Sequence, residues 1–352
     1  MIRLDTPLGT TQMVVGVGVV RDVVPRAREL GPRARRVGYV VDEHVDALWP
    51  APTWPEDLEP VVVKLPAGEA AKQRDVLATV QDALLELRRD EPVIVRGGGA
   101  ALDVGGFAAA TVRRGLAWIA VPTTVVAMAD AALGGKTAVN HPRGKNLLGV
   151  FHPPAHVIAD VDHLSTLPER EVHAGLAEVY KCARLGAPGL HRLLAAGVPR
   201  DAQAWVAVLE ASARLKAEVV AQDERDFGVR RRLNYGHTVG HALERVLGPE
   251  VVRHGEAVAL GMVVAAALAV RRGLIPAADA THQRDDLVRL GLPVRLPATV
   301  PAAQILAALG EDKKRTDDHR HTFVLPIAAD DVRIVDDVTN DEITKALAAI
   351  SP

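Results

Sequence analysis

Short, almost wholly apolar runs alternate with amphipathic stretches through the first half of the chain. The apolar runs have the length of buried strands and predict the interior of a sheet over residues 13–20, 36–41, 61–65, 93–96 and 118–121. The stretches between them have helical spacing and predict helices over 23–30, 71–89 and 102–112. This alternation predicts a parallel sheet with helices on both faces. Ligands bind at the carboxyl ends of the strands in such sheets.

Long Ala- and Leu-rich segments replace this alternation from residue 169 onward. They predict helices over 169–185, 202–221, 230–246, 256–272 and 277–290. Only 322–327 and 332–335 have the pattern of strands. We therefore expect an α/β domain over residues 1–162, followed by a mostly helical domain over 163–352.

Composition supports a two-domain enzyme or binding protein. The 352 residues suffice for two domains at about 150 residues each. Lys and Arg number 42 against 44 Asp and Glu, a formal charge of −2. This balance argues against nucleic acid as the main partner, because phosphate backbones attract an excess of positive charge. The one cysteine, Cys182, excludes an intrachain disulfide and a Cys-rich zinc site.

The apolar segments do not predict a membrane protein. The longest, 257–270, is shorter than the ~20 residues that cross a hydrocarbon core, so we expect a buried helix there. Polar residues interrupt the N-terminus before the apolar stretch of a signal peptide could form. We expect a cytoplasmic protein with no membrane partner.

A glycine triplet, Gly97, Gly98 and Gly99, follows the apolar strand at 93–96 and precedes the helix that carries Asp103. Glycines at this position let backbone N–H groups approach a pyrophosphate at the positive end of the helix. A tight strand-to-helix turn is the alternative, since the G-x-G-x-x-G fingerprint is absent. Thr123 and Thr124 end the next strand, where their hydroxyls could bind a ribose or phosphate, or merely cap a helix.

The segment 130–146 is the densest polar stretch of the chain. Its lysines, asparagines, histidine and aspartate suit the recognition of phosphate and polyols. The alternative is a solvated surface loop. Apolar residues interleaved among the polar ones favour a functional role.

Two imidazoles, His237 and His241, lie four residues apart and share one helix face. The general-base Glu of H-E-x-x-H is missing, which disfavours a zinc protease. His254 begins a later helix, and Glu178 lies on an earlier one, three residues before Lys181. One carboxylate and imidazoles from separate helices suit a catalytic divalent cation. Capping or core roles for the histidines are the alternative.

These segments belong to an ordered series of blocks that extends from Asp42 to Lys314. The series resembles the 3-dehydroquinate synthases and the wider family of sugar-phosphate cyclases. The blocks are Gly97-Gly98-Gly99…Asp103, Pro122-Thr123-Thr124, Asp130…Gly134-Gly135-Lys136-Thr137-Ala138-Val139-Asn140, Gly144-Lys145-Asn146, Gly175-Leu176-Ala177-Glu178…Lys181, Lys216-Ala217-Glu218, Leu233-Asn234-Tyr235-Gly236-His237-Thr238…His241, His254-Gly255-Glu256 and Asp312-Lys313-Lys314.

The resemblance implies a zinc- and NAD-dependent enzyme, with Co²⁺ as an alternative metal. It also implies a homodimer whose subunits have a Rossmann-like N-terminal domain and a helical C-terminal domain. Carried over by position, the metal ligands would be Glu178, His237 and His254. Arg114 would reach across the dimer interface into the neighbouring subunit's substrate pocket.

The remaining family positions fall into two sets. NAD would contact Asp42, Glu69, Lys72, Gly97, Gly98, Gly99, Asp103, Thr123, Thr124, Lys136, Lys145 and the turn formed by Ser165, Thr166 and Leu167. The substrate pocket would be lined by Asp130, Lys136, Asn146, Lys181, Lys216, Arg230, Asn234, His241, Lys313 and Lys314.

The activity implied by the resemblance converts 3-deoxy-D-arabino-heptulosonate 7-phosphate to 3-dehydroquinate and phosphate. NAD⁺ would oxidise the carbon-5 alcohol while zinc lowers the pKa of that hydroxyl. Phosphate would then leave by elimination, NADH would return the hydride, and an intramolecular aldol step would close the ring. The departing phosphate would itself remove the proton. Arg230 and Lys216 would bind the substrate carboxylate.

Several positions depart from the commonest family pattern: His44, Leu102, Pro153 and the unusual segment 182–188. That segment resembles the aminodehydroquinate synthases, which act on an amino analogue and form the alternative within the family. Cyclases that make 2-deoxy-scyllo-inosose lack the equivalent of Asn234, and valiolone-type cyclases lack the carboxylate-binding pair. Outside the family, the alternatives are a metal-dependent NAD alcohol dehydrogenase and an inactive NAD-binding regulator.

Overall fold

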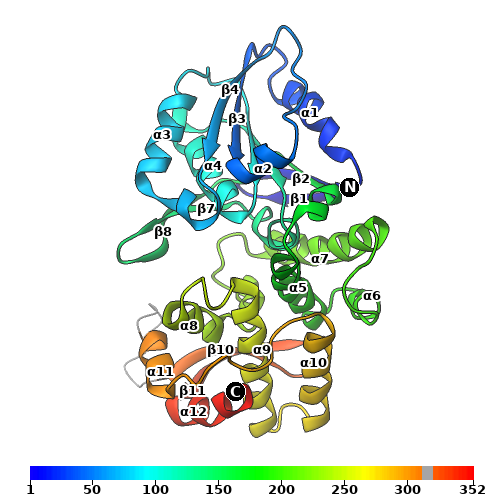
Figure 1. Cartoon of the computed structure of the whole chain (residues 1–352), viewed down its shortest axis with the longest axis vertical. Coiled ribbons are helices and arrows are strands. Elements are labelled where there is room, and N and C mark those ends of the chain that lie inside the picture. The colour runs from blue at the N-terminus through cyan, green and yellow to red at the C-terminus, as the bar shows by residue number, and fades with distance from the viewer. Residues whose placement is uncertain (311–319) are drawn as a thin grey trace. The chain divides into compact units, whose positions relative to one another are not determined.

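The structure is a computed structural model that describes residues 1–310 and 320–352, and these form two compact units (Figure 1). The first unit comprises Met1–Leu167 together with Lys216–Arg225. The second comprises Pro168–Leu215 and Asp226–Pro352. The prediction of a boundary between residues 162 and 163 does not include the return of 216–225 to the first unit.

The first unit is built on a seven-stranded sheet with the order β1-β2-β9-β6-β5-β3-β4. Every adjacent pair is parallel except β1 and β2, which form an antiparallel hairpin at one edge. The strands are β1 (Ile2–Thr6), β2 (Gly9–Gly16), β3 (Arg36–Asp42), β4 (Glu59–Leu65), β5 (Val93–Gly97), β6 (Trp118–Pro122) and β9 (His156–Asp160). The parallel sheet is therefore confirmed. The sequence pattern misses β1, which has charged residues at alternate positions, and β9, whose apolar run is only three residues long.

Helices and a second hairpin complete the first unit. The helices are α1 (Val23–Leu30), α2 (Glu43–Leu48), α3 (Arg74–Leu84) and α4 (Gly99–Thr111), with short 3₁₀ turns at Val19–Asp22, Gly68–Lys72, Val112–Arg114 and Val161–Thr166 and a π-turn at Ala127–Ala131. Helix α4 packs very close to the sheet, because a Cβ on Gly105 would lie 2.5 Å from Val95 Cγ1. The polar stretch 130–146 begins at the end of the π-turn and forms part of an antiparallel hairpin of β7 (Lys136–His141) and β8 (Gly144–Phe151).

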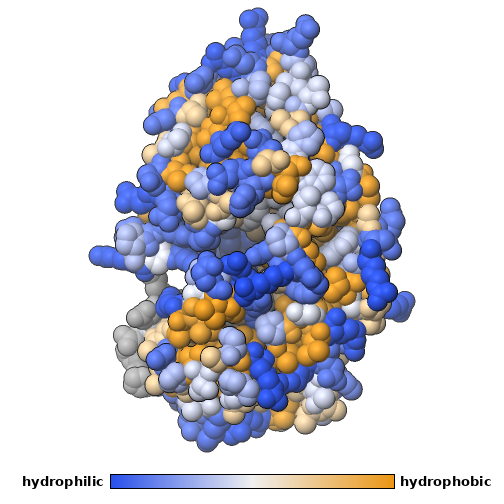
Figure 2. Space-filling model, in the orientation of Figure 1, coloured by the Kyte–Doolittle hydropathy of each residue, from blue (hydrophilic) through white to orange (hydrophobic). Residues whose placement is uncertain are grey.

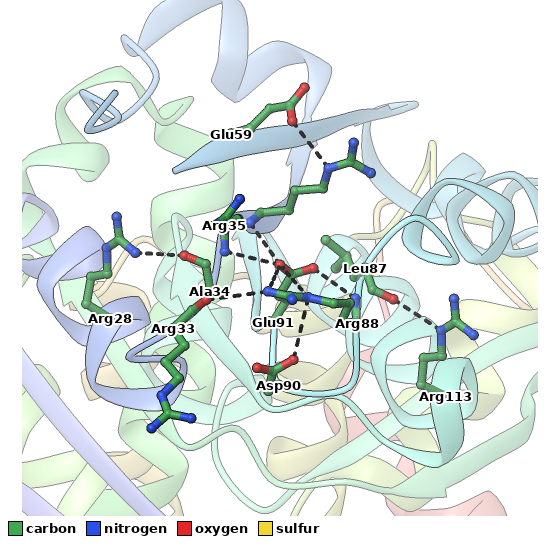
Figure 3. Close-up of polar contacts among 11 residues, drawn as sticks. Arg28, Arg33, Ala34, Arg35, Glu59, Leu87, Arg88, Asp90, Glu91 and Arg113 are labelled. Carbon is green, nitrogen blue, oxygen red and sulfur yellow. Dashed lines mark hydrogen bonds and ion pairs between the residues drawn. The ribbon is translucent and has the colours of Figure 1, made fainter. Parts of the chain in front are cut away.

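A buried carboxylate, Glu91, ties together the loops that precede β3 and β5 (Figure 3). It accepts backbone hydrogen bonds from Arg35 and Arg36, both at 3.1 Å, and from Arg88 at 2.8 Å. Burial raises the pKa of this carboxyl, but the backbone hydrogen bonds outweigh that effect and hold it below its usual value. Glu91 thus fixes the amino ends of two central strands, while the opposite ends carry the candidate site.

The second unit is mostly helical, as predicted. Its elements are α5 (Glu169–Arg184), α6 (Leu190–Leu194), most of α7 (Ala202–Gln222), α8 (His237–Leu247), α9 (His254–Arg271), α10 (Ala277–Arg289), α11 (Ala302–Gly310), the hairpin β10 (Arg320–Pro326) and β11 (Val332–Thr339), and α12 (Asn340–Leu347). The predicted helix over 230–246 is wrong in part. Gly236, at a φ of 81°, separates the 3₁₀ turn Val229–Asn234 from α8.

Helix α9 is the apolar centre of the second unit. By length and composition α9 could cross a membrane, but 72% of this apolar segment is buried inside the protein. Glycines bring neighbouring helices against it: a Cβ on Gly255 would lie 1.7 Å from the carbonyl oxygen of Ala174, and one on Gly261 would lie 1.9 Å from that of Gly236. Figure 2 shows hydrophilic residues interspersed with smaller apolar areas on the visible face. The long apolar run is therefore a core helix.

Candidate functional site

The predicted metal ligands converge from three helices of the second unit. Glu178 lies on α5, His237 begins α8, and His254 begins α9. One ligand atom from each lies within 4.8 Å of the other two. Glu178 Oε1 is 3.4 Å from His237 Nε2 and 3.2 Å from His254 Nε2. The tight packing of α5, α8 and α9 around glycines sets this geometry.

Each imidazole uses its other ring nitrogen for an outer partner. His237 Nδ1 donates to the carbonyl oxygen of Tyr235 at 3.1 Å, and His254 Nδ1 lies 3.1 Å from Glu244 Oε2. A proton on Nδ1 leaves the Nε2 lone pair of a neutral imidazole directed toward Glu178. Hydrogen bonds of this type are typical of histidines that bind metals.

The Glu178 carboxylate is charged although its side chain is only 1% exposed. Burial by itself raises the pKa of Glu178. Attraction to Lys181 and His237 has the larger effect and holds the pKa well below its ordinary range. Lys181 Nζ donates to Oε2. Among the described residues, Oε1 accepts no hydrogen bond. A buried anionic oxygen without a hydrogen bond, facing two imidazole nitrogens, fits a divalent cation.

His254 responds to the same negative charges. Burial lowers the pKa of His254, but the adjacent carboxylates of Glu178 and Glu244 outweigh it and raise the pKa to about 10. A proton therefore supplies the positive charge that this cluster requires. A bound cation would displace it, because a histidine ligand must be neutral at the binding nitrogen.

In the first unit, the predicted nucleotide-binding residues meet at the carboxyl ends of neighbouring strands. Thr123 N donates to Gly97 O at 3.0 Å, which joins the ends of β5 and β6. A Cβ on Gly97 would lie 3.0 Å from Asp42 Cβ, and one on Gly98 would lie 3.2 Å from Thr124 Cγ2. Gly99 begins α4, whose first backbone N–H groups face this edge. The arrangement suits a pyrophosphate.

Asp42 and the turn at 165–167 frame this edge of the sheet. Asp42 caps helix α2 by accepting from His44 N at 2.9 Å and from Val45 N at 3.3 Å. Thr166 accepts a hydrogen bond at 2.9 Å from the indole of Trp49, which follows α2. The predicted turn of Ser165, Thr166 and Leu167 therefore lies beside the α2 segment.

A charged cluster links the strand ends to the β7–β8 hairpin. Lys72 Nζ donates to Asp103 Oδ2 at 2.5 Å and also to Asn146 Oδ1. Nearby, Asn140 Nδ2 donates to Glu69 Oε1 at 2.6 Å. Burial raises the pKa of Asp103, and Lys72 opposes this effect. Hydrogen bonds thus connect predicted nucleotide-binding and substrate-binding residues within one unit.

The other predicted residues divide by position. Lys216 Nζ lies 2.8 Å from Asp130 Oδ1 in the first unit. Lys136 and Lys145 are exposed on the β7–β8 hairpin. In the second unit, Arg230 is buried and Asn234 partly buried at the turn before α8, and His241 is exposed on α8. Arg114 is exposed with a φ of 65°. Lys313 and Lys314 lie outside the described residues.

Comparisons with known proteins agree with the resemblance. Residues 62–174 match the 3-dehydroquinate synthase N-terminal family model, and 175–315 match the C-terminal model. The chain is 45% identical to a 3-dehydroquinate synthase from Synechococcus over 295 residues, covering 82% of this chain and 80% of that protein. It is 42% identical to one from Geobacter metallireducens over 337 residues, covering 92% and 93%.

Solved structures give the same picture. A 2-epi-5-epi-valiolone synthase from Streptomyces hygroscopicus, with NAD⁺ and Zn²⁺ bound, has a TM-score of 0.84 and 30% identity over 97% of this chain and 96% of that one. A 2-deoxy-scyllo-inosose synthase with NAD⁺ and Co²⁺ has a TM-score of 0.86 at 24% identity, over 98% of both chains, and supports the fold alone. The iron-containing and glycerol dehydrogenases match more weakly, at TM-scores of 0.68 and 0.63.

Proposed function

This chain belongs to the 3-dehydroquinate synthase family, and from that premise we propose which of its residues carry the reaction. The enzyme is a phosphate-eliminating cyclase that acts on a small sugar-acid phosphate. The observation that carries the proposal is the buried Glu178 carboxylate, whose Oε1 accepts no hydrogen bond among the described residues and faces two imidazole nitrogens. The substrate is 3-deoxy-D-arabino-heptulosonate 7-phosphate and the product is 3-dehydroquinate.

Glu178, His237 and His254 would hold the divalent ion, with Zn²⁺ as the first candidate and Co²⁺ as the second. When bound, such an ion lowers the pKa of a coordinated hydroxyl and polarises the carbon–oxygen bond. Lys181 holds the Glu178 carboxylate in its charged form through Oε2, which leaves Oε1 for the ion. Three protein ligands leave an open position, as catalytic sites require.

The edge formed by Asp42, the glycine triplet and the two threonines would bind NAD. NAD⁺ supplies a hydride acceptor that can return the hydride, so the cofactor is regenerated in each turnover. The backbone N–H groups at the start of α4 would bind the pyrophosphate, because the helix terminus carries a partial positive charge. Glu69, Lys72, Asp103, Lys145 and the 165–167 turn complete the proposed NAD contacts.

Charged side chains account for recognition of the substrate. Arg230 and Lys216 would bind its carboxylate, for which the planar guanidinium offers two parallel donors. Lys136, Asn146, His241 and the pair Lys313 and Lys314 suit its phosphate. Asp130, which pairs with Lys216, and Asn234 and Lys181 complete the proposed set of substrate-binding residues. The departing phosphate would remove the neighbouring proton, so a separate general base is not required.

Assembly and location extend the same proposal. The enzyme acts as a homodimer in the cytoplasm, and Arg114 enters the neighbouring subunit's site. Arg113, Arg114 and Gly115 all have positive φ. This unusual turn supports the proposal that the backbone here holds the Arg114 side chain toward the neighbouring subunit. Strain of this kind persists where the surrounding structure holds it in place.

The test follows inorganic phosphate and reduced-nicotinamide absorbance in the same reaction. The cyclase should release phosphate from 3-deoxy-D-arabino-heptulosonate 7-phosphate without accumulation of NADH. Its amino analogue and sedoheptulose 7-phosphate serve as comparison substrates. Preference for the amino analogue would support the aminodehydroquinate synthase alternative. Net NADH without phosphate would indicate an alcohol dehydrogenase, and NAD binding without phosphate release would indicate an inactive regulator.

A further inference from the structure

Glu244 is a partly buried acidic side chain to which neither the sequence motifs nor the proposed reaction assigns a role. It lies on α8, seven residues after His237, and this spacing places both on one helix face. Only 16% of its side chain is exposed. Its Oε2 lies 3.1 Å from His254 Nδ1, whereas His254 Nε2 faces Glu178. Glu244 thus approaches the metal triad from outside, through His254.

We propose that Glu244 is a positioning residue that fixes the tautomer and orientation of His254 for metal binding. The proposal rests on the metal site of the proposed function. A carboxylate can only accept from an imidazole N–H, so Glu244 selects the form of His254 with its proton on Nδ1. The lone pair is then on Nε2, the nitrogen that faces Glu178. The negative charge of Glu244 also offsets part of the charge of a bound cation.

The two imidazoles are held by different kinds of partner. His237 Nδ1 donates to the backbone carbonyl of Tyr235, which no substitution of a side chain removes. The hydrogen bond of His254 Nδ1 depends on the side chain of Glu244. A substitution of Glu244 can therefore test how much such an outer contact contributes to metal binding. The remaining support for His254 comes from the start of α9, where Glu256 binds the backbone N–H of Arg253 at 2.8 Å and the guanidinium of Arg170.

A second reading of the same residues is that Glu244 is itself a ligand. His241, Glu244 and His254 also have ligand atoms within 4.8 Å of one another. Both triads include His254, however, and a neutral imidazole offers one lone pair and one N–H. It can bind one cation through Nε2 while donating from Nδ1, but it binds two cations only after losing both ring protons. The geometry therefore favours a hydrogen bond from His254 to Glu244.

The experiment measures Zn²⁺ and Co²⁺ affinity of the metal-depleted full-length protein by competition with a chromophoric chelator. Glu244→Ala removes both the acceptor and the charge, and should weaken binding by about 100-fold, the upper end of the effect of such outer partners. Glu244→Gln keeps an amide oxygen that can accept from Nδ1, and should weaken it by about 10-fold. The visible absorption bands of bound Co²⁺ should shift in both variants.

Controls separate this role from general damage. Glu169→Gln removes a side chain that is 86% exposed at the start of α5, and should leave metal affinity unchanged. His241→Ala should also leave it within about twofold of the wild type, well below the effect of an outer partner. Thermal unfolding shows whether each variant is folded. If Glu244→Ala fails to fold, the metal affinity of the near-isosteric Glu244→Gln tests the proposal.

The outcomes are distinct. Wild-type affinity and Co²⁺ spectra in folded Glu244→Ala or Glu244→Gln would overturn the proposal and leave the metal site intact. A loss in His241→Ala as large as that in Glu244→Ala would overturn it in favour of a ligand role. If the wild-type protein itself binds neither ion, the metal part of the proposed function fails as well.

Discussion

The two units prepare their ligand sites in opposite ways. In the first, polar side chains are already paired: Lys72 bonds both Asp103 and Asn146, and Asp42 caps α2. In the second, Glu178 keeps a buried oxygen that accepts no hydrogen bond among the described residues, and His254 holds a proton at neutral pH. The proposed nucleotide-binding residues of the first unit are therefore already hydrogen-bonded to one another, whereas the second unit balances its buried carboxylate with a proton on His254 that a bound cation would displace. Changes in the second unit should therefore affect metal and chemistry, and changes in the first should affect the nucleotide.

The largest expected effect is that of His254→Ala, which removes a proposed ligand from the second unit. Activity and metal content should be lost together, with metal affinity falling by more than about 100-fold, because a direct ligand contributes more than an outer partner. Metal analysis of the purified variant and a phosphate-release assay check this. His282→Ala, an exposed histidine on α10, is the matched control. Full zinc occupancy in His254→Ala would show that the ligand assignment is wrong.

The next effect is expected for Arg230→Ala, also in the second unit. Loss of the buried guanidinium should weaken the binding of carboxylate-bearing substrates by about 2–5 kcal/mol, because the substrate charge is left unpaired. Zinc content should stay at the wild-type level. Steady-state kinetics on 3-deoxy-D-arabino-heptulosonate 7-phosphate measure this change, with the partly exposed neighbour Arg231→Ala as control. An unchanged kcat/KM would remove Arg230 from the substrate site.

A smaller effect, limited to nucleotide binding, is expected for Gly97→Ala in the first unit. The new methyl group would lie 2.6 Å from Ala101 Cβ and 3.0 Å from Asp42 Cβ. Relieving this overlap should displace the end of β5, at a cost of about 1–3 kcal/mol. NAD affinity, measured by calorimetric titration, should fall while metal content stays the same. Loss of metal together with NAD would contradict the separation between the units.

The smallest effect concerns the response of the first unit to pH. Burial, and then the adjacent Arg96, lower the pKa of His163. The unfolded chain therefore binds a proton near pH 6.5 that the folded chain refuses, and stability is lost as the pH falls through that value. The loss grows as the pH falls from 6.5 toward the lower pKa of the folded state. Thermal unfolding at pH 7.5 and 5.5 measures it, and His163→Gln should reduce the difference. An equal difference in both proteins would exclude His163 as the cause.

Local patterns of apolar residues predicted most of the architecture, whereas the candidate site residues were carried over from the family resemblance. The apolar runs identified β3, β5 and β6, and the ordered motifs identified Glu178, His237 and His254. The strand β1 was not predicted, because it lies at the edge of the sheet and its apolar residues alternate with charged ones. The break before α8 required a positive φ at Gly236, which helical periodicity does not reveal.

Contacts between distant segments could not be predicted in the same way. Lys72 and Asn146 meet only because the β7–β8 hairpin brings together residues 74 positions apart, and no local pattern encodes that contact. Glu244 is different. Its spacing of seven residues from His237 was visible in the sequence and placed it on the ligand face of α8, so helical geometry alone could have drawn attention to it.

The most direct test of the account is a Zn²⁺ titration of metal-depleted enzyme in the presence of NAD⁺ and substrate. Phosphate release and reduced-nicotinamide absorbance are followed together. The account predicts that phosphate release rises with added Zn²⁺ and reaches its plateau at one ion per chain, while NADH does not accumulate. Phosphate release at full rate without metal, or NADH formed in proportion to phosphate, would contradict it.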